Sequence, residues 1–283
     1  MPELPEVETI RRIVQVHLVG RRCVAVTIGL PKLLRFSPIP DLQRLIGREV
    51  LAAERRAKVL TITFSGDLAL MIHFKLAGQF AVLLPDGSRA VAGHPVPRPD
   101  GPYPHRATHV TFEFDDGTVA YYSDVRQFGW LRLMPLSDVP GELERYQFGP
   151  EAVRGAFTAG DLGSRLRRRG VPIKTALLDQ TVLAGLGNIY VDEALFAAKI
   201  NPCRPASSLV ESDLVALSET IPDVIEEGIK QGGATIVNRR AFPIDGFPAI
   251  HGRAGEPCVV CGATVDKMRV GARGTYLCRN CQR

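Results

Sequence analysis

The feature that most constrains this chain is a pair of Cys-x2-Cys motifs near its C-terminal end. The motifs are Cys258/Cys261 and Cys278/Cys281, with sixteen residues between the two pairs. Four thiolates at this spacing are typical of a structural zinc site, in which they surround one Zn2+ as a tetrahedron. A tail this short buries too little apolar surface to fold alone, and bound zinc would supply about 10–16 kcal/mol. The segments "TVDKMRV" and "TYLC" flank the turn "GARG", so we predict a β-hairpin that carries the metal.

Two other interpretations of these cysteines are less favoured. A redox dithiol needs only one Cys-x2-Cys motif, whereas two motifs on one hairpin indicate a metal. A catalytic zinc keeps an open coordination position, which four thiolates do not leave. The remaining cysteines, Cys23 and Cys203, stand alone. Six cysteines in 283 residues fit a reducing compartment better than a secreted disulfide scaffold.

Length and hydrophobic pattern narrow the class of protein further. With 283 residues, 45% of them hydrophobic, one large domain or two ordinary domains are expected. No segment reaches the run of about 18 apolar residues that spans a bilayer. The acidic N-terminus lacks the basic-then-apolar order of a secretory signal. We therefore expect a soluble protein that stays inside the cell and does not engage membranes.

The charge is modestly basic, and its distribution is uneven. The net charge is +5, and arginine supplies 28 of the 35 basic residues. From residue 238 onward, eight basic side chains stand against three acidic ones, and a second basic cluster comprises Arg165, Arg167, Arg168 and Arg169. The planar fork of arginine suits phosphates, so these patches indicate a polyanion such as nucleic acid. The alternative is a solvated surface with ordinary arginine usage.

Two halves of the chain show different hydrophobic periods. The first half predicts short antiparallel strands over 23–30, 59–64, 68–74, 79–84, 109–114 and 118–123, which suggests a β-sandwich, with a long Pro/Gly-rich loop over 92–107. The second half predicts helices over 158–169, 174–184, 188–198 and 210–231. In "LAGLGNIYVDEALF" (183–196), glycines break one helix and Asn188 can cap the next, whose acids Asp192 and Glu193 fall early.

The N-terminus, "MPELPEVETIRR", predicts a short helix in which Pro5 suits the first position and the acids favour the helix dipole. On that interpretation Glu3, Glu6 and Glu8 are capping residues. The remaining motifs change this interpretation for Glu3 and Glu6, but not for Glu8.

Taken together, six stretches closely resemble the bacterial formamidopyrimidine-DNA glycosylase family, which removes oxidised bases from DNA. They are "PELPEVETIRR", "RRAKVL" (55–60), "DVRQFG" (124–129), "LAGLGNIYVDEALF" (183–196), "IKQGG" (229–233) and "GEPCVVCG…RGTYLCRNCQR" (255–283). They follow the family's order and cover nearly the whole chain.

The resemblance implies an α+β fold in three parts. These are an N-terminal antiparallel β-sandwich with an N-terminal helix (1–135, catalytic), a helical helix-two-turn-helix DNA-binding domain (136–250), and a β-hairpin zinc finger (251–283). It implies one structural Zn2+, held by Cys258, Cys261, Cys278 and Cys281. It also implies a cytoplasmic, nucleoid-associated bacterial protein that acts as a monomer on double-stranded DNA containing oxidised bases or abasic sites.

The resemblance also assigns the chemistry. Removal of the initiator methionine would expose Pro2 as a secondary amine, which attacks C1′, displaces the base and leads to strand cleavage by β- and then δ-elimination. Glu3 matches the family's acid–base residue, and Glu6 a supporting acid near the same site. Glu8 has no comparable match and keeps the capping interpretation. Lys58 matches the lysine that holds the lesion's phosphate, and Lys174 a supporting lysine near the lesion pocket.

The DNA-binding residues follow from the same matches. Asn188 and Arg273 match the residues that grip the phosphates flanking the damaged nucleotide. Arg126 and Phe128 match a wedge that enters the duplex opposite the lesion, which offsets the cost of extruding a nucleotide. Leu76 stands where the family commonly has methionine, and leucine can still fill the gap left by an extruded base.

Besides Leu76, the chain differs from the family's pattern in a segment that bears on lesion choice. The segment over 234–254 looks shorter than in family members that read 8-oxoguanine with a flexible loop. The leading hypothesis is excision of oxidised purines. One alternative is endonuclease VIII-like preference for oxidised pyrimidines or hydantoins, although "PELPE" differs from the "PEGPE" start of that group. Another is a non-catalytic protein that binds damaged DNA, against which the set Pro2, Glu3 and Lys58 argues.

Overall fold

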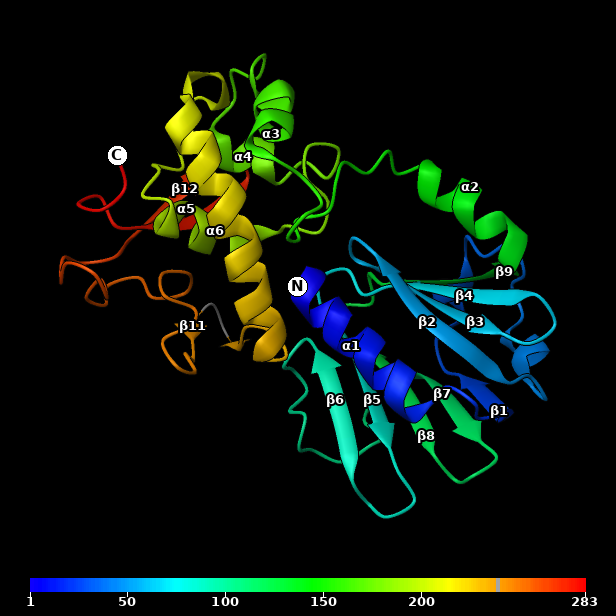
Figure 1. Cartoon of the computed structure of the whole chain (residues 1–283). Helices are drawn as coiled ribbons and strands as arrows, with labels where there is room; N and C mark the ends of the chain where they lie inside the picture. Colours follow the sequence, from blue (N-terminus) through cyan, green and yellow to red (C-terminus); the bar gives the residue numbers. More distant parts are fainter. Residues whose placement is uncertain (238–239) are drawn as a thin grey trace. The chain divides into compact units, whose positions relative to one another are not determined.

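The computed structural model describes residues 1–237 and 240–283, so Asn238 and Arg239, the first residues of the basic tail, lie outside the described residues. The chain divides into two units, Met1–Arg145 and Tyr146–Arg283 (Figure 1). Each unit is described by itself. Within the described residues, we find no helix that is both long and apolar enough to cross a membrane.

Two antiparallel sheets form the first unit. The five-stranded sheet has the order β1-β7-β8-β5-β6 and the four-stranded sheet the order β2-β3-β4-β9. In the first sheet the strands are β1 (Cys23–Ile28), β5 (Gly78–Leu83), β6 (Arg89–Gly93), β7 (Thr108–Phe114) and β8 (Val119–Asp124). In the second they are β2 (Val50–Arg56), β3 (Val59–Phe64), β4 (Leu68–His73) and β9 (Trp130–Pro135). Figure 1 shows helix α1 (Leu4–His17) lying along the strands.

One apolar core joins these sheets and the helix. It contains Phe80 and Tyr122 from the five-stranded sheet, Leu60 and Leu70 from the four-stranded sheet, and Ile10 from α1, all nearly inaccessible to solvent. Side chains from both sheets meet in this core, so the sheets pack face to face. The predicted antiparallel β-sandwich with an N-terminal helix is confirmed.

The sequence missed three of these strands for a common reason. β2, β6 and β9 each carry at least one arginine and only one β-branched or aromatic residue, whereas the six predicted strands are richer in such residues. β2, β6 and β9 lie at the edges of their sheets, where pairing on one side is enough to form a strand. Short helices complete the first unit: η1 (Pro31–Leu34), η2 (Leu42–Leu45), η3 (Leu136–Asp138) and α2 (Val139–Glu144).

The second unit is mostly helical and ends in a hairpin. Its helices are α3 (Ala159–Leu166), α4 (Ile173–Leu177), α5 (Asn188–Ala197), η4 (Ala206–Ser208) and α6 (Glu211–Lys230). Its strands are β10 (Ile236–Val237) paired with β11 (Arg240–Ala241), and β12 (Asp266–Val270) paired with β13 (Arg273–Leu277). The predicted β-hairpin between the two cysteine pairs is therefore confirmed.

The predicted helix over 174–184 was too long, because α4 ends at Leu177. Directly afterwards, side-chain hydrogen bonds stabilise a turn instead of a further helical turn. The Asp179 carboxylate accepts the backbone N–H of Thr181 at 2.9 Å, and the Gln180 side-chain oxygen accepts the backbone N–H of Gly185 at 2.9 Å. Such local side-chain bonds offer the backbone an alternative to helix.

The hairpin shares a core with α5. Phe196 of α5 packs with Ile250, Val265 and Tyr276, together with Cys258 and Cys278. The tail therefore does not depend on a metal alone, because it also buries apolar surface against the helical part of its unit.

The capping interpretation of Glu8 was wrong. Glu8 lies inside α1 and pairs with Arg11 and Arg12 at 2.9 Å each and with Arg55 of β2 at 3.3 Å. Burial alone would raise the pKa of Glu8, but hydrogen bonds from the two helix arginines and the charge of Arg55 outweigh it and lower the pKa to about 2. This carboxylate therefore ties α1 to the neighbouring sheet.

A carboxylate whose pKa is lowered in the folded state stabilises the fold above its ordinary pKa and loses this effect as the pH falls toward the lowered value. We expect Glu8→Gln to reduce the free energy of unfolding by about 2–3 kcal/mol at pH 7. The difference from the native protein should shrink below about pH 4.5 and fall to about half near pH 3. Thermal unfolding of both proteins across this pH range measures it.

The matched control is Glu54→Gln, because Glu54 is an exposed residue of β2. Its unfolding should follow that of the native protein at every pH. A Glu8→Gln penalty that stays constant from pH 7 to pH 3 would contradict the ion-pair account.

Candidate functional site

The N-terminal residues are held in place despite lying at the start of the chain. Pro2 and Glu3 are buried directly before α1. The carboxylate of Glu6, one turn further on, accepts the backbone N–H of Glu3 at 2.8 Å. Glu6 itself is only 3% exposed. The backbone beside Pro2 is therefore fixed by a buried carboxylate and by the first turn of the helix.

Lys58 lies in the tight turn between β2 and β3. Ala57 before it adopts the left-handed conformation, with φ of +53°, and its carbonyl accepts a hydrogen bond from Arg55 at 2.9 Å. Lys58 is 9% exposed. Burial and the charges of Lys75 and Lys58 lower the pKa of His73 to about 3, so this imidazole is neutral beside the lysines. Sequence reasoning missed His73, which lies three residues before Leu76.

The predicted wedge residues Arg126 and Phe128, and the predicted gap-filling residue Leu76, lie in two turns of the first unit. Leu76 is half-buried in the turn between β4 and β5. Arg126 and Phe128 are exposed in the short loop between β8 and β9, where the guanidinium lies 5.3 Å from the ring centroid. Phe128 is 56% exposed, which leaves its ring available to a partner.

Lys174, in the second unit, is fully buried. Its ammonium donates to the carboxylate of Asp192 at 2.7 Å, to the Thr275 hydroxyl at 2.9 Å and to the Gly274 carbonyl at 3.0 Å. Both partners of the Lys174–Asp192 ion pair have fully buried side chains. Lys174 therefore joins α4, α5 and strand β13.

Asn188 does not cap α5, contrary to the prediction. The helix begins at Asn188 itself after Gly187, and the side-chain amide donates instead to the Gly274 carbonyl at 3.0 Å. The same carbonyl accepts from Lys174, so α4, α5 and the hairpin meet at one oxygen. Arg273 precedes this residue and has an exposed side chain at the start of β13. Asn188 and the backbone that carries Arg273 are thus held together.

The acids Asp192 and Glu193 have a role that the sequence did not reveal. The second oxygen of Asp192 lies 2.7 Å from Nδ1 of His251 and accepts the backbone N–H of Tyr276 at 3.2 Å. Glu193 accepts three consecutive backbone N–H groups, those of residues 249, 250 and 251, at 2.7–3.0 Å. Burial raises the pKa of Glu193, and these N–H groups oppose that rise. Two neighbouring carboxylates of α5 therefore hold residues 249–251 and strand β13.

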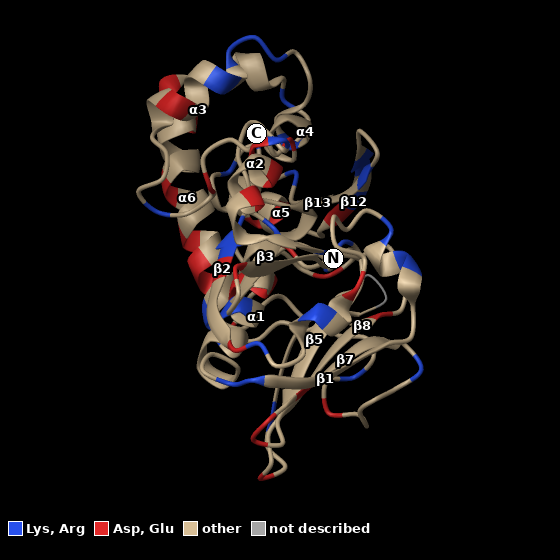
Figure 2. Cartoon of the chain, turned by 90° about the vertical axis from the view of Figure 1, so that its right-hand side faces the viewer, with Lys and Arg blue, Asp and Glu red and all other residues tan. Residues whose placement is uncertain are grey.

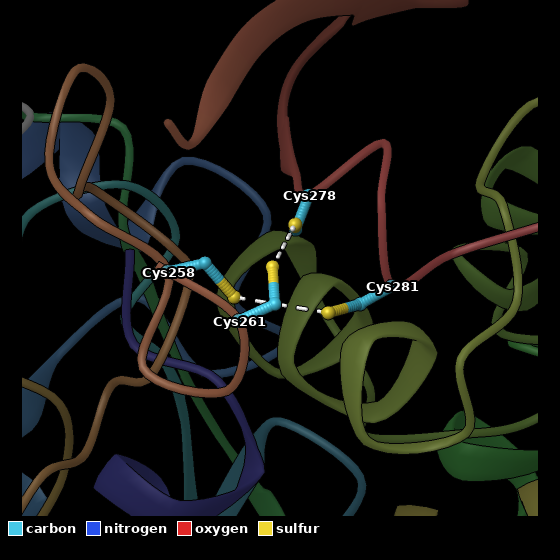
Figure 3. A group of neighbouring side chains, drawn as sticks. All are labelled: Cys258, Cys261, Cys278 and Cys281. Carbon is cyan, nitrogen blue, oxygen red and sulfur yellow. Dashed lines mark hydrogen bonds between the residues drawn. The ribbon is translucent and has the colours of Figure 1, made fainter. Parts of the chain in front are cut away.

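The four C-terminal cysteines converge on one point (Figure 3). Their sulfur atoms all lie within 4.8 Å of one another, with 3.5 Å between Cys261 and Cys278 and 3.9 Å between Cys258 and Cys281. A tetrahedral zinc with Zn–S bonds of about 2.3 Å places its sulfur ligands about 3.8 Å apart. The four thiols therefore fit one zinc ion, with no open coordination position. Zinc bound there would fix the hairpin and hence the backbone of Arg273.

Basic side chains gather in two places of the second unit. Figure 2 shows blue on the hairpin at β12 and in the turn that follows α3. In that turn Arg167 and Arg168 are exposed, whereas Arg169 pairs with Asp179 at 2.8 Å. The exposed arginines are suited to a polyanion.

Comparison with known proteins covers the whole chain. Three family models match: the formamidopyrimidine-DNA glycosylase N-terminal domain over 1–131, the formamidopyrimidine-DNA glycosylase H2TH domain over 148–240, and a zinc finger found in FPG and IleRS over 255–283. Formamidopyrimidine-DNA glycosylases from Herpetosiphon aurantiacus and Geobacillus kaustophilus are each 39% identical, and each alignment covers 100% of both chains.

Solved structures agree with these matches. A complex of the Lactococcus lactis Fpg with abasic-site DNA has a TM-score of 0.87 at 31% identity. The wild-type Lactococcus lactis Fpg with N7-benzyl-Fapy-dG DNA has a TM-score of 0.86 at 32% identity. A MutM complex with carbocyclic 8-oxo-G DNA has a TM-score of 0.84 at 32% identity. Each likeness covers 100% of both chains.

Two substitutions in the hairpin distinguish the structural role of the zinc ligands from the DNA-binding role of Arg273. Cys261→Ser should lose zinc and disorder the hairpin, because three thiolates bind the metal more weakly. Arg273→Ala should keep zinc but weaken DNA binding, and the slope of log K against log salt should fall by about 1. Elemental analysis and binding isotherms at several salt concentrations measure both effects.

Arg154→Ala is the charge-matched control. Arg154 is exposed, and its charge is already paired with Asp223 and Glu226. It should leave zinc content and the salt slope unchanged. A purified native protein without zinc, or an Arg273→Ala protein with an unchanged slope, would contradict this assignment.

Proposed function

Because the chain belongs to the formamidopyrimidine-DNA glycosylase family, we propose that it is a bifunctional DNA glycosylase and abasic-site lyase of base excision repair. Its substrates are formamidopyrimidines and 8-oxoguanine in double-stranded DNA. The observation that carries this proposal is the full-length likeness to solved complexes with Fapy-dG-type, 8-oxo-G-type and abasic-site DNA. The chain acts as a monomer in the bacterial cytoplasm, where DNA binding keeps it with the nucleoid.

Pro2 is the nucleophile. Once Met1 is removed, its nitrogen is a secondary amine at the chain terminus, and an α-amino group with an ordinary pKa of about 7.7–8 is partly neutral near pH 7. The neutral amine attacks C1′ of the damaged nucleotide, and the bond to the base breaks. The bond between Glu6 and the Glu3 N–H supports this role, because it fixes the backbone next to the attacking atom.

Glu3 moves the protons. It assists opening of the sugar ring as the amine forms an iminium at C1′, which draws electrons from the neighbouring C2′–H bond. Loss of that proton expels the 3′ phosphate, and a second elimination expels the 5′ phosphate. Water then hydrolyses the iminium and restores Pro2. The burial of Glu3, which is 1% exposed, keeps this carboxyl away from bulk solvent.

The other residues hold the DNA. Lys58 binds the phosphate at the lesion, and Asn188 and Arg273 bind the phosphates on either side. Leu76 fills the gap left by the extruded base, and Arg126 and Phe128 enter the duplex opposite the lesion. The exposure of Phe128 and Arg126 supports this role, as does the shared Gly274 contact that ties Asn188 to the strand of Arg273.

Two other functions are weaker. A non-catalytic protein that binds damaged DNA would not need Pro2, Glu3 and Lys58 together. Endonuclease VIII-like preference for oxidised pyrimidines or hydantoins would keep the same chemistry. The full-length relatives that match here carry the formamidopyrimidine-DNA glycosylase name, which favours oxidised purines.

Borohydride trapping on abasic-site DNA tests the nucleophile. The processed protein should form a covalent complex, because borohydride reduces the iminium. Pro2→Gly should trap only weakly, and a form that retains Met1 should show almost no trapping, because its Pro2 nitrogen is an amide. Pro40→Gly changes an exposed proline of the same unit and should trap like the native protein. Normal trapping by the form that retains Met1 would exclude Pro2 as the nucleophile.

The segment over 234–254 bears on lesion choice. Glu193 holds residues 249–251 of its described part. The Gln231 side chain donates a hydrogen bond of 3.0 Å to the Ile244 carbonyl. Phe242 and Ile244 of this segment are about half exposed. A short loop that closes over an extruded base offers fewer contacts to it. Lesions that pair poorly need less help to leave the stack, so they should gain relative to 8-oxoguanine.

Formamidopyrimidines, hydantoins and abasic sites should therefore be cleaved at least as fast as 8-oxoguanine, each placed opposite cytosine. Single-turnover rates in one duplex sequence measure this order. The Pro2, Lys58 and Arg273 contacts do not involve the base, so they serve every lesion alike. A rate for 8-oxoguanine well above all the others would show that the segment reads that base despite its length.

A further inference from the structure

The loop that carries Arg126 and Phe128 lies above buried residues at both of its ends. The four residues Val125–Phe128 are exposed, whereas Asp124 before them and Gly129 after them are buried. Asp124 is 0% exposed and ends strand β8. A fully buried carboxylate is rare in proteins unless it is paired or hydrogen-bonded, so its contacts indicate what it does.

Asp124 holds both ends of this loop. One carboxylate oxygen accepts the backbone N–H of Arg126 at 3.0 Å, and the other accepts that of Gly129 at 2.8 Å. The Asp124 carbonyl accepts the backbone N–H of Gln127 at 3.2 Å and the Nε2–H of His109 at 2.9 Å. One residue thus binds three of the loop's N–H groups, two of them through a charged acceptor, which gives the stronger type of hydrogen bond.

Close packing under Gly129 closes the loop. A Cβ atom at this position would lie 1.8 Å from the Tyr122 hydroxyl and 3.1 Å from the Asp124 carboxylate. Only glycine fits there, so the loop returns directly over the core. Gln127 adopts the left-handed conformation, with φ of +57°, which gives the loop its sharp bend. The conformation is therefore specific rather than one of many.

Side-chain packing does not hold this loop. Val125 is 42% and Phe128 is 56% exposed. A hollow of about 300 Å³ opens beside the loop, lined by Arg106, Ala107, His109, Asp124, Val125 and Gln127. With solvent on one side and a hollow on the other, the loop owes its shape mainly to the hydrogen bonds of Asp124.

We propose that Asp124 is a positioning residue that holds the Arg126–Phe128 wedge in its inserting conformation before DNA binds. This inference rests on the proposed function, in which that wedge enters the duplex. A preformed wedge avoids ordering the loop at the moment when a base pair must be opened. Asp124 should matter for extruding a paired base and much less for an abasic site, where no base has to leave the stack.

The ratio of two rates tests this on the full-length, zinc-loaded protein. Asp124→Asn keeps one oxygen acceptor but turns an NH2 group toward an N–H donor, so one of the two bonds is lost. Single-turnover excision of 8-oxoguanine opposite cytosine should fall at least tenfold. Strand cleavage at an abasic site in the same duplex should fall less than threefold. A loss of stability or of zinc would lower both rates together.

Two further variants complete the design. Asp86→Asn is the matched control, because the Asp86 carboxylate accepts the backbone N–H of Ser88 at 2.8 Å in an exposed hairpin turn. It should leave the ratio of rates unchanged. Phe128→Ala should reproduce the change in ratio, and adding Asp124→Asn to it should change the ratio little further, because both act through one wedge.

If Asp124→Asn does not fold, Gly129→Ala tests the same loop. Its Cβ would displace the loop from the Tyr122 hydroxyl, so the ratio should change as in Asp124→Asn. Tyr122→Phe removes that hydroxyl and should restore the ratio in the double variant, while leaving the native ratio unchanged when introduced alone.

Equal losses on both substrates in Asp124→Asn, or a further large change on top of Phe128→Ala, would overturn the positioning role. A native protein that cleaves neither substrate would instead refute the proposed function. The two failures are therefore distinguishable.

Discussion

Buried carboxylates that accept backbone N–H groups hold three segments to which a DNA-facing role is given, namely the N-terminus, the loop of Arg126 and Phe128, and the hairpin. Glu6 accepts from the residue next to Pro2, and Asp124 accepts from two residues of the wedge loop. Asp192 accepts from strand β13, and Glu193 accepts from three residues that lead into the hairpin. None of these four acids is more than 3% exposed. Removing one would leave buried donors unsatisfied, which costs about 1–3 kcal/mol for each group.

This arrangement answers a mechanical requirement of the proposed chemistry. A chain terminus, a short loop and a small hairpin are the parts of a protein that are ordinarily least ordered. Here each of them must present a group to within hydrogen-bonding or bond-forming distance of DNA. A charged acceptor beneath the backbone orders such a segment without covering its outer face. Zinc performs the same task at the far end of the hairpin, where the four thiols converge. The side chains that face outward, such as Phe128 and Arg273, are then left exposed.

Much of the fold could be predicted because its signals are local. Six strands follow from β-branched and aromatic residues between turn signals, and the zinc hairpin follows from cysteine spacing. The supporting acids could not be found in this way, because an isolated aspartate in a sequence suggests a solvated or helix-dipole role. Asp192 is buried only because Lys174, His251 and Tyr276 come to it from distant positions. A long-range contact also explains the error at Asn188. Its side-chain amide donates to the Gly274 carbonyl instead of capping its own helix. Glu8 was misassigned for the same reason, since Arg55 of another element is one of its partners.

Native-state hydrogen exchange at single-residue resolution, on the zinc-loaded protein without DNA, tests this account most directly. The amides of Arg126, Gly129 and residues 249–251 lie outside regular helices and strands, yet each is bonded to a buried carboxylate. The account predicts that they exchange at least about a hundredfold more slowly than an unprotected amide, with slowing comparable to that in the neighbouring strands. Exchange of these amides near the unprotected rate, while strands β8 and β13 stay protected, would show that these segments are not held before DNA binds and would contradict the account.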